Sequence, residues 1–307
     1  MSSQEIPKEF NQSFLVHPKT GEKLKIIEVI TDFDSPLLSR SNVSLPSFVQ
    51  QKMKQENPTY HHYPNRHIEK YGWKVFYQAT DQGLVLRNII FQDNYFVFKM
   101  LVPWVAQGYP CNLIQYFLRE RLAGPFVFIF EGGFLIWAVY KIGRYSSIGQ
   151  AFLFFEDGTF YPHVQHEGPS KLNYIPLYID FDVITASDNF AHNYYPWRLH
   201  VSRNWHLAVT EYERLASGET PPDEKYNIVL RNWYPPILGK VRVEFSKRDN
   251  AAQYVAKYLN YNLNKHPLLN LKGREIVRQD LVYVYVIRNA PAGIYGPRVV
   301  LEAYQKN

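Results

Sequence analysis

The chain has 307 residues, of which 46% are hydrophobic and 20% charged, a globular composition that excludes long disorder. The formal net charge is +6, but the basic residues are scattered, so we expect no nucleic-acid partner. Aromatic residues make up 16% of the chain and favour strands and pocket walls.

A single cysteine, Cys111, excludes an internal disulfide and suits a reducing compartment. The N-terminus lacks the apolar core of a signal peptide. The longest apolar stretch, 125–140, contains Glu131 and two glycines and is shorter than a membrane helix requires. We therefore expect a cytoplasmic protein with no membrane partner.

Residues 1–70 are polar and punctuated by proline, and we interpret them as an arm or linker. From Trp73 onward, short apolar or alternating runs separated by turn residues predict strands. The expected strands are Lys74–Gln78, Gly83–Phe91, Tyr95–Val102, Phe126–Phe130, Phe134–Lys141, Ala151–Phe155, Thr159–Val164, Tyr178–Thr185, Lys240–Phe245 and Leu281–Arg288.

Two turn signals, at 131–133 (E-G-G) and 156–159 (E-D-G-T), predict hairpins. Helical spacing of apolar residues predicts a helix over Asn250–Leu259 and a shorter helical turn over Thr210–Ala216. Many short strands with few helices indicate a mainly β protein, an antiparallel β-sandwich.

Four stretches of the sequence occur in an order that is also found in a known protein family. They are W-K-V-F-Y, G-L-V-L-R-N and K-M-L-V-P-W between 73 and 104, A-F-L-F-F-E-D-G-T at 151–159, Y-I-D-F-D-V at 178–183, and D-L-V-Y-V-Y-V at 280–286. In the same order, they resemble stretches of the catalytic domain of copper amine oxidases. The resemblance implies that residues 71–307 form that family's supersandwich.

The residues of the oxidative chemistry do not carry over. Lys171 and Asn173 stand where the family has two copper-binding histidines, and the turn with the third histidine reads N-A-P at 289–291. Tyr145 best matches the quinone-forming tyrosine but lacks its flanking motif, and Trp104 replaces the tyrosine that bonds the quinone. We therefore predict no copper and no topaquinone, and a degenerate family member rather than an amine oxidase.

The family's peripheral calcium site does have counterparts. The resemblance implies carboxylate ligands from Asp180, Asp182 and Asp280 and carbonyl ligands from Phe181 and Leu281. Aspartates at i and i+2 point to one side of a strand, and an all-oxygen set suits Ca²⁺. The prediction is a structural calcium ion; the alternative is that these are ordinary solvent-facing residues.

His163 and His166 are candidates for acid–base chemistry, since imidazole titrates near neutrality. A spacing of i, i+3 places them on opposite faces of a strand, so a shared metal site would need a turn. The alternative for both is hydrogen bonding in the core or to solvent.

Two functions follow. The first is a non-oxidative enzyme of specialised metabolism, a cyclase or isomerase acting on an apolar or aromatic small molecule. In it, Trp104, Tyr174, Asn173 and Lys171 bind the substrate, and Tyr145, His163 or His166 supplies a proton. The alternative is a non-catalytic pseudoenzyme that binds a small molecule or a protein. The resemblance also implies a homodimer, with Ser202–Pro236 as an embracing arm.

Overall fold

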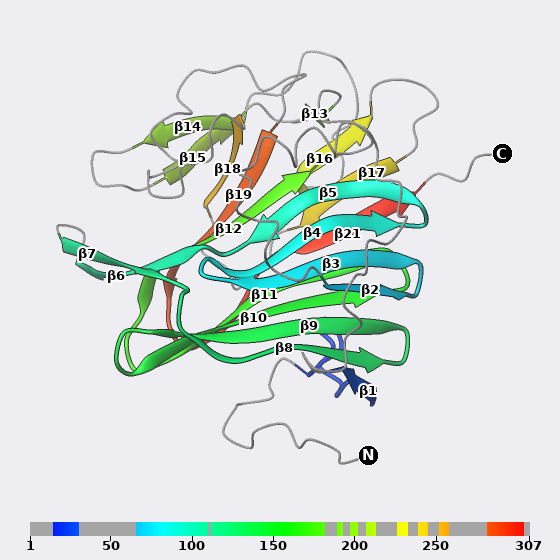
Figure 1. Ribbon diagram of the computed structural model, residues 1–307. Helices are drawn as coiled ribbons and strands as arrows, with labels where there is room; N and C mark the ends of the chain where they lie inside the picture. The colour runs from blue at the N-terminus through cyan, green and yellow to red at the C-terminus, as the bar shows by residue number, and fades with distance from the viewer. Residues whose placement is uncertain are drawn as a thin grey trace.

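The chain folds into two large antiparallel β-sheets that pack face to face (Figure 1). The computed structural model describes residues 15–30, 66–109, 112–181, 189–192, 197–201, 207–212, 226–232, 239–244, 252–257 and 281–303. No helix occurs among these residues, so none of them belongs to a helix that could span a membrane. The antiparallel β-sandwich that the strand pattern predicts is thus confirmed at this level.

The first sheet has ten strands. In spatial order they are β1 (Ile26–Ile30), β8 (Arg121–Phe130), β9 (Gly133–Ile142), β10 (Ser146–Phe155), β11 (Thr159–Glu167), β21 (Arg298–Ala303), β17 (Gly239–Glu244), β16 (Tyr226–Asn232) and β13 (Asn189–His192), while β20 (Gly293–Tyr295) pairs with β11.

The second sheet has nine strands. In spatial order they are β18 (Ala252–Lys257), β19 (Leu281–Ala290), β12 (Leu172–Phe181), β5 (Asn94–Leu101), β4 (Gly83–Phe91), β3 (Trp73–Thr80) and β2 (Arg66–Lys70), while β6 (Trp104–Tyr109) pairs with β12 and with β7 (Asn112–Phe117). The hairpin of β6 and β7 projects to the left in Figure 1. A separate pair joins β14 (Trp197–Val201) to β15 (Leu207–Tyr212).

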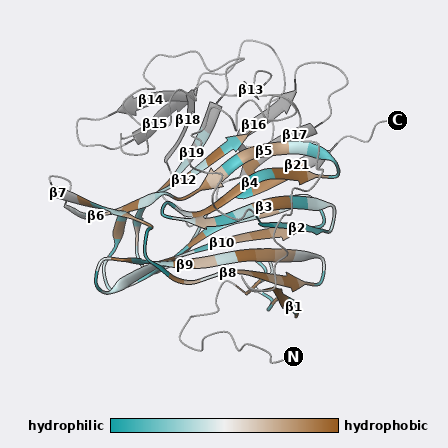
Figure 2. Ribbon diagram, in the orientation of Figure 1, coloured by the Kyte–Doolittle hydropathy of each residue, from teal (hydrophilic) through white to brown (hydrophobic). Residues whose placement is uncertain are grey.

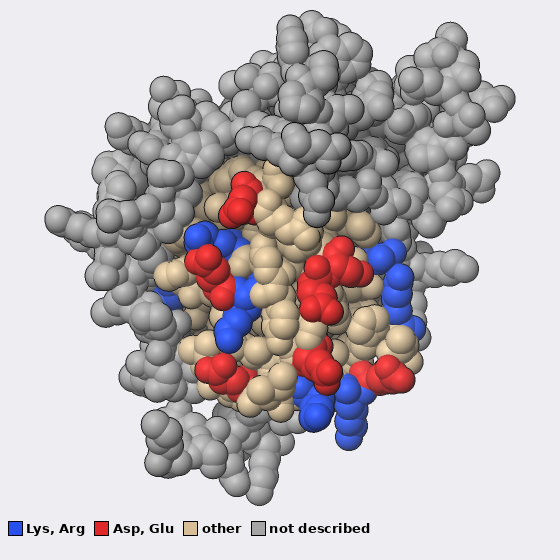
Figure 3. Space-filling view, turned by 90° about the vertical axis from the view of Figure 1, so that its right-hand side faces the viewer, with Lys and Arg blue, Asp and Glu red and all other residues tan. Residues whose placement is uncertain are grey.

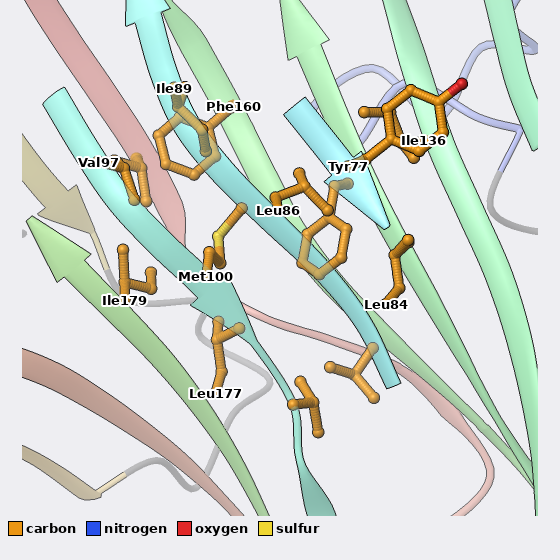
Figure 4. Packing of buried hydrophobic residues seen from close by; sticks show 14 of the residues in the cluster. Tyr77, Leu84, Leu86, Ile89, Val97, Met100, Ile136, Phe160, Leu177 and Ile179 are labelled. Carbon is orange, nitrogen blue, oxygen red and sulfur yellow. The ribbon is translucent and has the colours of Figure 1, made fainter. Parts of the chain in front are cut away.

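The main core fills the space between the sheets. Leu86, Met100 and Ile179 project into it from the nine-stranded sheet, and Ile136 and Phe160 come from the opposite sheet (Figure 4). A strand that is covered on both faces needs apolar residues on each side, so its sequence is a long apolar run. Figure 2 shows these runs along β8, β9 and β10, whereas hydrophilic residues interrupt β4, β5 and β12.

The structure confirms both predicted hairpins and places a strand at each of the ten expected ranges, as far as it describes them. The turn at Glu131-Gly132 joins β8 to β9, and Gly132 has a φ of 77°, which a residue without a Cβ adopts freely. Two strands also come from the predicted arm of residues 1–70: β1 pairs with β8, and β2 pairs with β3.

The predicted helix over Asn250–Leu259 is wrong. Residues Ala252–Lys257 form strand β18, which pairs with β19 from Ala252 opposite Val286 to Lys257 opposite Leu281. Its Tyr254 and Val255 are of residue types that fit a pleated sheet, and pairing with a neighbouring strand overrides a spacing pattern only ten residues long.

The expected helical turn over Thr210–Ala216 is also wrong where the structure describes it, because β15 continues to Tyr212. The segment Ser202–Pro236, which we predicted to be an arm, contributes β15 and also β16, a strand of the ten-stranded sheet between β17 and β13. The helical turn was predicted wrongly because β15 is held by pairing with β14, which a spacing pattern within one segment does not show. The embracing arm stays a prediction.

One buried polar side chain ties the two sheets together. Gln150 of β10 accepts a hydrogen bond from the backbone N–H of Leu84 at 2.6 Å and donates one to the carbonyl of Val102 at 3.3 Å. Gly83, with a φ of 94°, leaves room for this contact, because a Cβ there would lie 2.8 Å from the Gln150 amide oxygen.

Replacing Gln150 with leucine is expected to lower the free energy of unfolding by about 2–4 kcal/mol, because it leaves a buried N–H and a buried C=O unpaired. Urea denaturation measures the change. Gln115→Leu, at an exposed position of β7, is the control and should stay within about 0.5 kcal/mol. Equal stability of the two variants would contradict the role of Gln150 as a tie between the sheets.

Candidate functional site

Three ionisable side chains lie in one row across adjacent strands of the nine-stranded sheet. Arg87 of β4 stands opposite Lys99 of β5, and Lys99 stands opposite Asp180 of β12. Their neighbours along the strands, such as Leu86 and Met100, point into the core, so the row lies on the other, outer face. Nevertheless, Arg87, Lys99 and Asp180 are only 7%, 5% and 3% exposed.

Burial makes this row energetically expensive unless its charges compensate one another. Directly opposed residues of an antiparallel pair have Cβ atoms about 5 Å apart, which places Lys99 within reach of both neighbours in the row. The register thus places the side chains of Asp180 and Lys99 on one face of adjacent strands, in surroundings where electrostatic interactions are stronger than in water. Clusters of this kind occur at functional sites and also in structural ion-pair networks.

The same row continues toward the edge of the sheet with an aromatic pair. Phe76 stands opposite Arg87, and His67 opposite Phe76, with the rings of His67 and Phe76 stacked at a centroid distance of 5.6 Å. Gln78 lies on the same face two residues beyond Phe76 and is 5% exposed. The row therefore changes from charged to aromatic toward β2, with a buried amide beside it.

An aromatic cluster lies next to the charged row. Tyr178 is two residues before Asp180 on β12 and stands opposite Leu101, whereas Tyr174 stands opposite Ala106 of β6. Trp104, two residues before Ala106, faces the same side as these tyrosines. All three aromatic side chains are buried. Two of them, Trp104 and Tyr174, were predicted to bind substrate, and the structure brings these two together.

Both tyrosines of the cluster are protonated at neutral pH. Burial raises the pKa of Tyr178 well above its usual range, and the nearby Trp104 side chain opposes this only in part. Burial likewise raises the pKa of Tyr174, against a smaller effect from the charge of Arg288. Their hydroxyl groups are therefore neutral and able to donate hydrogen bonds.

We call this surface the outer-face site. It consists of His67, Phe76, Gln78, Arg87, Lys99, Trp104, Tyr174, Tyr178 and Asp180.

The other two predicted substrate-binding residues lie at the start of β12. Asn173 is half-buried, and Lys171 is exposed just before the strand. Neither stands in the row that contains the charged side chains. The resemblance placed them at a copper site, and the described structure gives them no role in the outer-face site.

The three predicted catalytic residues are not brought together. Tyr145 is 69% exposed on the turn between β9 and β10, with the Arg144 guanidinium 5.1 Å from its ring. His163 lies on the outer face of the ten-stranded sheet, 5.4 Å from the Tyr161 ring. His166 is buried, stands opposite Ile148 of the core, and its Nδ1 lies 3.0 Å from the carbonyl of Pro291.

Both histidines are neutral near pH 7. Burial lowers the pKa of His163 to about 4. Burial also lowers the pKa of His166, against hydrogen bonds to the carbonyls of Pro291 and Ala290 that raise it. Since a carbonyl only accepts, Nδ1 of His166 carries the proton, and its buried Nε2 has no hydrogen-bond partner among the described residues. The expected separation of the two rings on opposite strand faces is confirmed.

The calcium prediction rests partly on residues outside those described, because Asp182 and Asp280 are not among them. Phe181 is buried in the core, and Leu281 begins β19. Asp180 stands in register with Lys99, with Arg87 beyond it, so fixed cations already accompany this carboxylate. The calcium site stays a prediction, because two of its three carboxylates lie outside the described residues.

Two cavities lie at the end of the sandwich where the hairpin turns gather, the face that Figure 3 shows. One, of about 560 Å³, is bounded by the β8–β9 and β10–β11 turns and by residues 17–25. The other, of about 590 Å³, lies beside the β2–β3 and β4–β5 turns. Both acidic and basic side chains line each cavity, and none of the predicted site residues lines either one.

No protein-family model matches this sequence, and no curated protein is similar to it. Among solved structures, a copper-containing benzylamine oxidase from Hansenula polymorpha is similar, with a TM-score of 0.47 and 10% identity over 77% of this chain and 59% of that one. Lysyl oxidase from Pichia pastoris gives the same TM-score and identity over 77% and 51%. A galactose 1-epimerase from Lactobacillus acidophilus gives 0.44 and 8%, over 79% and 96%.

These are weak similarities of overall architecture, and they assign no residue a role. The chain spans between half and three-fifths of the length of the two amine oxidases. The outer-face site therefore has to be interpreted from its own residues.

Proposed function

We propose that the protein is a non-oxidative enzyme that binds an apolar or aromatic small molecule at the outer-face site and rearranges it by proton transfer. The observation that carries the proposal is that an ionisable pair, Lys99 and Asp180, adjoins the buried aromatic side chains of Trp104 and Tyr178. Aromatic walls with a few polar groups are typical of small-molecule sites. A cyclase or isomerase of specialised metabolism fits this description.

The proposed reaction requires mainly that the protein position the substrate beside the two ionisable side chains. In an isomerisation, the Asp180 carboxylate takes a proton from a substrate carbon, and the Lys99 ammonium gives a proton to another substrate atom. The product then has the same mass as the substrate, and one exchange of protons restores both side chains. In the proposal neither copper nor topaquinone takes part, because Lys171, Asn173 and the N-A-P turn at 289–291 replace the three histidine ligands of the amine oxidases.

A non-catalytic binding protein is the second candidate, and one observation favours it. Tyr145, His163 and His166 lie on a surface turn, on an outer face and in the core, respectively, so no acid–base group predicted from the sequence reaches the aromatic cluster. In this alternative, Lys99 and Asp180 form a structural ion pair, and the site holds its ligand without changing it.

Mass spectrometry of the small molecules that co-purify with the protein tests the proposal. Replacing Trp104 with alanine is expected to lower ligand occupancy at least about tenfold, because it removes a large apolar contact. Incubating the recovered ligand with fresh protein in D₂O then separates the candidates. An isomer with one deuterium supports the enzyme, and an unchanged ligand supports the binding protein. Equal occupancy in the Trp104→Ala variant and in the control Tyr145→Phe would refute both.

A further inference from the structure

The cavity of about 560 Å³ beside the β8–β9 and β10–β11 turns has walls that the chain itself fixes. The two turns are joined, because the backbone N–H of Glu156 donates a hydrogen bond of 2.9 Å to the carbonyl of Gly132. The third wall, residues 17–25, is held by its own backbone, since the N–H of His17 donates to the carbonyl of Glu22 at 2.7 Å. The cavity is therefore formed without a ligand, as small-molecule sites usually are.

Aromatic side chains form the floor of this cavity, and the opposite sheet holds that floor in place. The Tyr71 hydroxyl donates a hydrogen bond to the carbonyl of Phe130 at 2.9 Å, and the Trp73 indole N–H donates one to the carbonyl of Phe155 at 2.8 Å. The rings of Phe155 and Tyr161, both of which line the cavity, lie 5.8 Å apart. An apolar group of a ligand would therefore meet a rigid aromatic surface.

The rim of the cavity carries charges of both signs, which Figure 3 shows on this face. Residues 17–25 contribute three exposed lysines, and the two turns contribute three exposed carboxylates: Lys19, Lys23, Lys25, Glu131, Glu156 and Asp157. Among the described residues, no ion pair joins these lysines to these carboxylates. The two kinds of wall are thus free to bind opposite charges of one ligand.

We propose that this cavity binds a short zwitterionic peptide, with its terminal ammonium at the carboxylates of the turns and its terminal carboxylate at the lysines of residues 17–25. An apolar side chain of the peptide contacts Phe155 and Tyr161 on the floor. The volume of about 560 Å³ lies within the range of small-molecule sites, which suits a peptide of a few residues. This site is separate from the outer-face site, so the inference does not depend on the proposed function.

Isothermal titration calorimetry at low ionic strength tests the inference, because salt screens exposed charges. The probes are the tripeptide Ala-Phe-Ala and its N-acetylated, C-amidated and doubly blocked forms. Blocking either end is expected to weaken binding about fivefold, the upper range for a solvent-exposed charge pair. Blocking both ends should weaken it by about the product of the two effects.

Replacing the three lysines together, as Lys19→Gln, Lys23→Gln and Lys25→Gln, tests where the carboxylate of the peptide binds. This variant should bind the free and the amidated peptide equally, and it should still prefer the free peptide to the acetylated one. All three side chains are exposed, so the fold should be retained. The matched control is Lys70→Gln with Lys171→Gln, two exposed lysines outside this cavity, which should bind like the wild type.

The opposite result is expected for Glu131→Gln with Glu156→Gln, which removes charge from the turns. This variant should lose the preference for a free ammonium and keep the preference for a free carboxylate. Equal binding of the free and the doubly blocked peptide by the wild type, or binding of neither, would overturn the inference. An equal loss in the lysine variant and its control would also overturn it, because net charge would then explain the effect. The comparison of the four peptides needs no variant, so it stands even if a variant folds poorly.

Discussion

Replacing Lys99 with methionine is expected to lower the free energy of unfolding by about 3–5 kcal/mol if Lys99 and Asp180, which stand opposite each other, form a buried ion pair. The physical reason is the position of Lys99 between Arg87 and Asp180. Methionine keeps most of the side-chain volume, so the loss is mainly electrostatic. It leaves a carboxylate that is 3% exposed without the cation that stands opposite it.

The double variant Lys99→Met with Asp180→Leu should recover much of this stability, since it removes both charges of the pair. The matched control is Lys74→Met, which breaks the Lys74–Glu69 ion pair at 3.0 Å, where the glutamate side chain is 62% exposed. That change should cost less than about 1 kcal/mol. A loss of similar size in Lys99→Met and Lys74→Met, with additive effects in the double variant, would contradict a buried ion pair.

Acidification from pH 6.5 to about 4 is expected to lower the free energy of unfolding by about 3 kcal/mol through His163 alone. Burial lowers the pKa of its imidazole to about 4 in the folded protein, against 6.5 in the unfolded chain. Between these values the unfolded chain binds the proton and the folded protein does not. The contribution of His163 is thus fully present above pH 6.5 and is lost as the pH falls toward 4.

Urea denaturation at several pH values between 4 and 7.5 measures this effect in the wild type and in His163→Gln. Carboxyl groups titrate equally in both proteins, so the difference between the two curves isolates the histidine. The variant should lose less stability on acidification than the wild type. Parallel curves would show that His163 is as accessible to protons in the folded protein as in the unfolded chain.

The strands of the sandwich could be predicted because their signals are local. The E-G-G turn at 131–133 and the apolar runs on either side of it fix the β8–β9 hairpin without reference to the rest of the chain. The error at Ala252–Lys257 has the opposite cause. That strand depends on β19, about 30 residues away, and its own six residues suit either structure.

The site was predictable only in its aromatic part. The resemblance to copper amine oxidases singled out Trp104 and Tyr174, and the structure places them on one face. Arg87, Lys99 and Gln78 were missed because alternation predicts which side of a strand a residue faces, but not whether that side is covered. The sequence did contain a signal, because lysine and arginine recur at outward positions of otherwise apolar strands. Asp180 also lies at such a position. Their register joins residues 81 positions apart in sequence, which no local pattern reveals.

We propose that the outer face of the nine-stranded sheet holds a small-molecule ligand. Hydrogen–deuterium exchange of the protein, with and without the small molecule that co-purifies with it, tests it most directly, because ligand binding slows the exchange of the backbone amides it covers or stabilises. We predict slower exchange in β3, β4, β5, β6 and β12, which carry the outer-face site, and no change in the β8–β9 and β10–β11 turns. Protection at those turns, with none in β5 and β12, would contradict the account.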